Sequence, residues 1–145
     1  MINRSISEVY EIVANNYFTN YSKWCPEIIE LDEISTGLIH SGTRGSQTKR
    51  NRGLDCHSTF EVGEFNQNKS LEIKGVSESF RSIYDLSKNE IGGTRLSYKF
   101  ELGDLGLSML PFRIILNDAV NDAAEEIVAN IKSLIETPID LINVH

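Results

Sequence analysis

The last third of the chain carries a helical pattern that is too long to stand alone. Apolar residues recur there at steps of three and four, with charged residues on the opposite side. The apolar positions are Phe112, Leu116, Ala119, Val120, Ala123, Ile127, Ile131 and Leu134, and the charged ones are Asp118, Asp122, Glu125, Glu126 and Lys132. Between Pro111 and Pro138 this predicts one amphipathic helix of about 25 residues, or about 37 Å. Its apolar stripe must lie along an equally long apolar surface.

Six segments ahead of this helix have strand character and are separated by turn residues. They are residues 28–34, 43–49, 54–65, 71–76, 80–86 and 94–102. The last is the clearest, because apolar and polar residues alternate strictly along it. Such alternation indicates one buried and one solvated face, as in antiparallel sheets. Six strands without intervening helices exclude an alternating parallel α/β architecture.

The N-terminal segment predicts small elements. Residues 2–6 could form a short strand, and Ser5 with Glu8 resembles a capping box ahead of a helix over 7–16. The aromatic segment 17–24 predicts a second short helix, which ends before Pro26. The predicted fold class is therefore α+β, with an antiparallel sheet that curls around the long last helix.

Chain length and net charge limit the number of domains and the kinds of binding partner that this sequence allows. A chain of 145 residues fits a single domain spanning 1–145. Fourteen basic and 21 acidic residues give 14 − 21 = −7, which argues against nucleic-acid or anionic-membrane partners. No apolar run is long enough for a signal peptide or a membrane span, so we expect a cytoplasmic protein without membrane insertion. In that compartment we expect the two cysteines, Cys25 and Cys56, to be reduced.

Four short passages occur in an informative order along the chain. They are a Y-x-x-W-x-P sequence from Tyr21 to Pro26, Gly42-Thr43-Arg44, Ser58–Val62 and Gly93–Tyr98. Together with the long last helix, they resemble the polyketide cyclase/dehydrase branch of the START-like SRPBCC superfamily, from Ser5 to about Glu136. The resemblance implies the helix-grip (START/Bet v 1-like) fold: a curved antiparallel sheet of six to seven strands wrapped around the C-terminal helix, with a cavity for an apolar ligand between them. That family usually has a longer first strand than this chain.

Strand alternation selects the candidate ligand-binding residues. If the apolar side of segment 94–102 faces inward, the paired strands send hydroxyls inward among apolar neighbours, as ligand pockets do. The predicted ligand-binding residues are Trp24, Ser58, Phe60, Ser82, Tyr84, Tyr98, Phe100, Phe112 and Leu116. Cys56 is predicted to share this face, and Tyr17 to close the cavity mouth beside Trp24. The alternative, that Tyr84 and Tyr98 are core aromatics, stays open.

Catalytic and metal signals are weak. No metal-ligand spacing or dinucleotide glycine motif occurs, so we predict no cofactor, no metal and no catalytic residue. Asp55, His57 and Ser58 suggest a hydrolytic triad, but neighbours on a strand point oppositely, which opposes that interpretation. A basic run indicates either a solvated hairpin or a docking patch for an acidic protein partner; it consists of Arg44, Lys49, Arg50 and Arg52.

These observations support three functions. The first is binding or carriage of a small hydrophobic ligand, such as a lipid, polyketide or aromatic compound. The second is a cyclase/aromatase-like enzyme in which Ser58, Tyr84 and Tyr98 polarise a carbonyl. The third is a protein-interaction module that uses a sheet edge or the basic hairpin.

Overall fold

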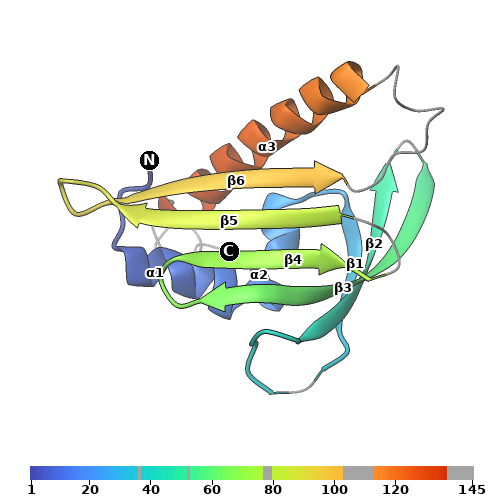
Figure 1. Cartoon of the computed structure of the whole chain (residues 1–145), viewed down its shortest axis with the longest axis horizontal. Coiled ribbons are helices and arrows are strands. Elements are labelled where there is room, and N and C mark those ends of the chain that lie inside the picture. The colour runs from blue at the N-terminus through green and yellow to red at the C-terminus, as the bar shows by residue number, and fades with distance from the viewer. Residues whose placement is uncertain (36, 52, 77–79, 103–112, 137–145) are drawn as a thin grey trace, which may run out of the picture.

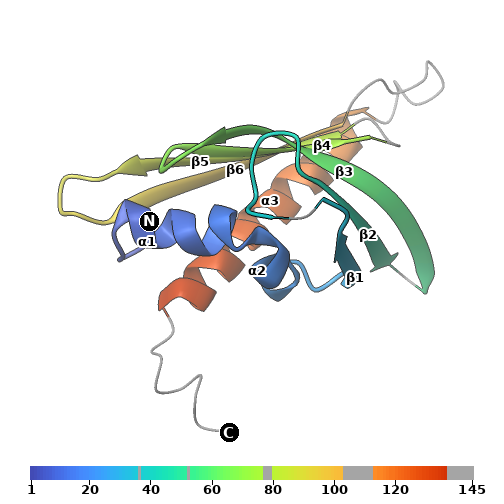
Figure 2. The same ribbon diagram turned by 90° about the horizontal axis from the view of Figure 1, so that it is seen from below.

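The structure of the protein is a computed structural model that describes residues 1–35, 37–51, 53–76, 80–102 and 113–136. Six strands form one antiparallel sheet in which each strand lies beside the next along the chain (Figure 1). They are β1 (Ile28–Glu33), β2 (Arg44–Asn51), β3 (Leu54–Asn66), β4 (Ser70–Gly75), β5 (Phe80–Lys88) and β6 (Thr94–Leu102). Helices α1 (Ile6–Tyr10), η1 (Glu11–Asn15), α2 (Tyr17–Trp24) and α3 (Arg113–Glu136) lie on one face of the sheet (Figure 2). The predicted α+β class and all six predicted strands are confirmed.

The inner face of the sheet and the helices enclose the core. Strand register places Leu71, Tyr84 and Tyr98 in one row across β4, β5 and β6. Ile73 and Ser82 lie opposite each other in the next row. Apart from Tyr98, which is half-buried, all of these side chains are buried. The alternation predicted for these strands is therefore present, and hydroxyls do lie among apolar side chains on this face.

A β-bulge in β3 bends the sheet. The pairing of β3 with β4 shifts between Val62 and Phe65. Within this bulge the backbone N–H of Glu64 donates to the Glu72 carboxylate at 3.1 Å, and a Cβ on Gly63 would collide with that carboxylate. Glu72 also binds Arg81 at 2.6 Å on the outer face. Because bulges increase local twist and bending, this one helps the sheet curve over the helices.

The N-terminal strand prediction is wrong. Only Ile2 pairs with the sheet, exchanging backbone hydrogen bonds of 2.7 and 2.9 Å with Thr94. Ser5 then caps α1, because its hydroxyl accepts the N–H of Glu8 at 3.3 Å, and the helix begins at Ile6. A side-chain cap satisfies an amide that would otherwise lack a partner, which favours an early helix start over an extended strand.

The first helical stretch contains an unpredicted π-helical turn. In η1 the N–H of Asn16 donates to the carbonyl of Glu11, five residues back, at 3.0 Å, and the Asn16 side chain donates to the same oxygen. A π-turn inserts an extra residue and so rotates the faces of the helix that follows. In α2 the buried face then consists of Tyr17, Tyr21 and Trp24.

Helix α3 has 24 residues, close to the predicted length, and Ile127, Ile131 and Leu134 of the predicted apolar stripe pack in or against the core. Ile131 and Ile135 are buried, whereas Ala123, which we predicted to face inward, is exposed. Asn130 donates from its side chain to the Trp24 carbonyl at 3.2 Å and so joins α3 to α2. Among the described residues, no helix has the length and apolar character needed to span a bilayer.

Candidate ligand-binding site

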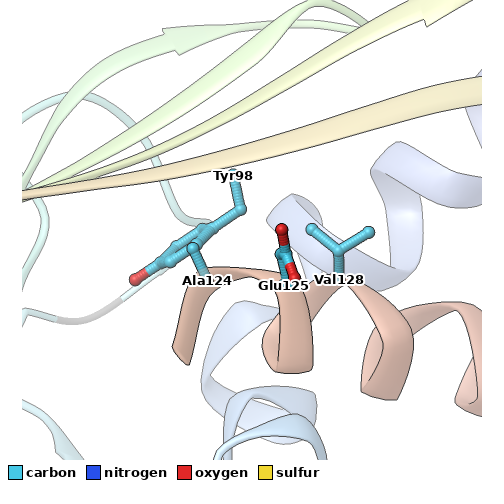
Figure 3. A pocket seen from close by; sticks show the side chains of 4 residues that line it. All are labelled: Tyr98, Ala124, Glu125 and Val128. Atoms are coloured by element: carbon cyan, nitrogen blue, oxygen red, sulfur yellow. The ribbon is translucent and has the colours of Figure 1, made fainter. Parts of the chain in front are cut away.

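A pocket of about 450 Å³ lies between β6 and α3 (Figure 3). Its described lining consists of Tyr98 from the strand and Ala124, Glu125 and Val128 from two successive turns of the helix. Figure 3 shows Tyr98 extending from β6 toward α3, with the three helix side chains on the side of α3 that faces the strand. The volume is within the range of small-molecule sites.

Tyr98 presents the polar group of the sheet wall. Its hydroxyl lies 3.0 Å from the Ser82 hydroxyl on the neighbouring strand, and its ring centroid lies 4.8 Å from that of Tyr84. Burial raises the pKa of Tyr98 to about 12. At neutral pH the phenol is therefore protonated, and it can donate a hydrogen bond to a ligand but is a poor general base.

Aromatic side chains fill the space behind this wall. The indole N–H of Trp24 donates to the Tyr84 hydroxyl at 3.3 Å, and both residues are almost completely buried. Tyr17 packs against both rings and stacks on Tyr21 with centroids 4.7 Å apart. Burial raises the pKa values of Tyr17, Tyr21 and Tyr84 well above the ordinary tyrosine value. These hydroxyls belong to the core rather than to the pocket surface.

Solved structures share this arrangement across almost the whole chain. Ara h 8.0201, a Bet v 1 family protein, has a TM-score of 0.71 and 13% identity, covering 94% of this chain and 93% of its own. SA2116 from Staphylococcus aureus, a protein of unknown function, has a TM-score of 0.71 and 15% identity, with 97% and 91% covered. TTHA0849 from Thermus thermophilus has a TM-score of 0.66 and 11% identity, with 92% and 91% covered.

The chain has the helix-grip fold. No protein-family model and no curated protein sequence matches it. The likeness to solved structures at these identities concerns architecture, so function has to be argued from the site.

The helix-grip architecture places the predicted site residues at different depths. Tyr98 lines the pocket, and Ser82 and Tyr84 lie directly behind it. We had expected Trp24 and Tyr17 at the pocket mouth. Both are instead buried, and Trp24 packs against Tyr84. Phe112 is outside the described residues. Of Leu116, the structure describes only its place in α3.

The remaining predicted residues lie farther along the inner face. Phe60 is fully buried and stacks on Phe18 with centroids 5.8 Å apart. The Ser58 hydroxyl accepts the side-chain N–H of Gln47 at 3.2 Å. Phe100 is half-buried and stacks on Phe80 at 5.9 Å. None of these residues belongs to the described lining of the pocket, although all share its face of the sheet.

Three lining residues escaped the sequence analysis. Ala124 and Val128 were not assigned to the apolar stripe, and Glu125 was assigned to the solvated face. The missed signal is a second apolar series, Ala124, Val128, Ile131 and Ile135, which also recurs at helical steps. Both series contain Ile131, so periodicity alone did not distinguish them.

The cysteine prediction is partly wrong. Cys56 is exposed rather than inward-facing, because Leu54–His57 at the start of β3 is exposed on both faces. Cys25 is the buried cysteine; its thiol donates to Glu27 at 3.3 Å. Burial is the main cause that raises the Cys25 pKa, to about 11. A thiol of this kind is a poor nucleophile at neutral pH.

The triad residues make separate contacts. Asp55 binds Arg50 at 2.7 Å, His57 contacts the Thr48 hydroxyl at 3.1 Å, and Ser58 binds Gln47. They do not form a relay, which agrees with the argument from strand alternation. In the part of the chain that the structure describes, no group of three or more histidine, cysteine or acidic side chains could hold a metal ion.

Proposed function

We propose that this helix-grip protein binds a small hydrophobic ligand between β6 and α3. The observation that carries the proposal is the pocket of about 450 Å³, whose described walls combine an aromatic ring that bears a hydroxyl, two aliphatic side chains and one carboxylate. Burying a ligand against such walls removes apolar surface from water, which is the main driving force for binding. The helix-grip fold supports the proposal, since it implies a cavity between sheet and helix.

The chemistry of the walls favours binding over catalysis. Tyr98 holds its proton at neutral pH, and its hydroxyl neighbour Ser82 is not a base. The alternative is a cyclase-like enzyme in which Tyr98, oriented by Ser82, donates to a carbonyl that gains negative charge. That reaction also needs a group that removes a proton from the substrate. In the described lining only the Glu125 carboxylate could do so, and it is exposed to water rather than enclosed with Tyr98.

Filling the pocket tests the proposal. We expect diphenylhexatriene, a neutral probe that fluoresces in apolar surroundings, to bind the protein saturably. Ala124→Phe places a ring inside the pocket and should abolish binding, whereas Ala123→Phe places the same ring on the exposed side of α3 and should retain it. Circular dichroism checks that both variants fold. If Ala124→Phe does not fold, Val128→Phe is used as the pocket-filling variant instead. Unchanged probe binding in a folded pocket variant would refute the site.

Native mass spectrometry of protein purified from its own host gives an independent result. A co-purifying mass of lipid or aromatic size supports a carrier or an enzyme. A ligand released chemically changed after incubation with the protein supports the enzyme, and an unchanged ligand supports the carrier.

A further inference from the structure

Among the described lining residues of the pocket, Glu125 carries a charge that hydrophobic binding leaves unused. Glu125 lines the pocket together with Tyr98 and Val128, on the side of α3 that faces β6 (Figure 3). We infer that the ligand carries a protonated amine, which binds Glu125 and the Tyr98 ring. This inference rests on the proposed function. The rest of the ligand is apolar and packs on Ala124 and Val128.

Unlike five other acidic side chains of the described chain, Glu125 takes part in no ion pair. Glu72 and Glu101 bind Arg81, Asp55 binds Arg50, and Glu136 binds Lys132. With the described residues of the chain, Glu125 forms neither an ion pair nor a hydrogen bond. The described pocket lining also contains no basic residue. The pocket therefore presents a negative charge without a protein partner.

The Tyr98 ring in the same pocket lining favours the same kind of ligand. The face of a tyrosine ring is electron-rich and attracts a cation within about 6 Å of its centroid. An ammonium group between Glu125 and Tyr98 would gain an ion pair and a cation–π contact together. A carboxylate ligand would instead meet repulsion from Glu125 and from a chain of net charge −7.

Three probes with one ring system and different end groups test this inference. They are 2-naphthylmethylamine, 2-naphthylmethanol and 2-naphthoate, each titrated calorimetrically into the full chain at neutral pH. We expect the amine to bind about fivefold to thirtyfold more tightly than the alcohol, and the carboxylate to bind most weakly. Added salt should reduce the advantage of the amine.

Two glutamine variants separate the pocket charge from the general acidity of the helix. Glu125→Gln should lower the amine affinity to that of the alcohol without changing alcohol binding. Glu126→Gln removes the same charge from the exposed neighbour, which is not among the described lining residues, and should keep the preference for the amine.

The outcomes distinguish this inference from the proposed function. The inference is overturned if 2-naphthoate binds as tightly as the amine, or if Glu125→Gln keeps the full preference for the amine. In either case, saturable binding of the alcohol would still support a hydrophobic site. If neither these probes nor diphenylhexatriene bind saturably, the proposed function fails and the inference fails with it.

Discussion

Tyr84 and Tyr98 face each other across two strands but differ in role. Tyr84 is 1% exposed, and its hydroxyl accepts the indole N–H of Trp24, which lies 60 residues away in sequence. Tyr98 reaches the pocket and pairs with Ser82. Alternation along β5 and β6 predicted that both rings face inward. It could not separate core from pocket wall, because that depends on which helix residues pack against each ring.

Removing each hydroxyl should therefore have different effects. Tyr84→Phe leaves a buried indole N–H without its acceptor, so we expect the free energy of unfolding to fall by about 1–3 kcal/mol with little change in probe binding. Tyr98→Phe should weaken a ligand that accepts its hydrogen bond by at most about 0.5–1.5 kcal/mol. Urea denaturation and calorimetry measure the two quantities. In a cyclase, Tyr98→Phe would instead lower the rate about 100-fold or more.

The tyrosines also predict alkaline sensitivity. All five have raised pKa values in the folded protein, to about 12 for Tyr10 and Tyr98 and well above the ordinary value for Tyr17, Tyr21 and Tyr84, with desolvation the main cause. The folded state therefore holds these protons more tightly than the unfolded chain. Their contribution to stability is complete below the ordinary tyrosine pKa of 10.0 and decreases as the pH rises toward 12 and beyond.

We expect tyrosinate absorbance to appear only above pH 10, together with loss of the near-ultraviolet circular dichroism of the native fold. The buried thiol of Cys25, with its pKa raised to about 11, acts in the same direction. Tyrosine titration near pH 10 with the native spectrum retained would contradict the burial described above.

At the scale of elements, sequence patterns located the strands well and the helix faces less well. For the six strands predicted between residues 28 and 102, every boundary lies within two residues of the observed one. Turn residues explain this accuracy, since Gly53, Asn68 and Gly92 adopt the positive φ angles that end one strand and admit the next. On α3, Ile127, Ile131 and Leu134 face the core as predicted, but Ala123 is exposed. The pocket residues Ala124 and Val128 were missed because neighbouring apolar series overlap on a helix. The π-turn η1 left no sign in the apolar spacing.

The corrected face of α3 predicts which substitutions destabilise the fold. Ile131 is 0% exposed, and Ile131→Ala should lower the free energy of unfolding by about 2–5 kcal/mol. Ala123→Asp, on the exposed side, should change it by no more than about 0.5 kcal/mol. Thermal and chemical denaturation of the two variants test the assignment. A severe loss in Ala123→Asp would mean that Ala123 faces inward, as predicted from the sequence.

At the scale of the whole molecule, charge sets the expected partners. The net charge is −7, and the basic run is partly neutralised, because Arg50 binds Asp55 and Arg44 lies 3.9 Å from Glu61. We expect no binding to single-stranded or duplex DNA at physiological salt, since such binding depends on clustered cations that displace counterions. Fluorescence anisotropy of a labelled oligonucleotide measures this. Tight binding that weakens steeply with salt would contradict it.

The single bridge at Ile2 has a consequence for solubility. Since Thr94 exchanges both its backbone hydrogen bonds with Ile2, alternate residues of β6 direct their N–H and C=O groups away from β5. Leu96, Tyr98 and Phe100 continue this series along an edge to which the described chain adds no further strand. An open edge is a template for aggregation, and charged side chains along it discourage stacking of chains. The exposed Arg95 and Lys99 supply such charges. We therefore expect the charges on β6, the strand that shapes the pocket, to discourage edge-to-edge association of chains as well.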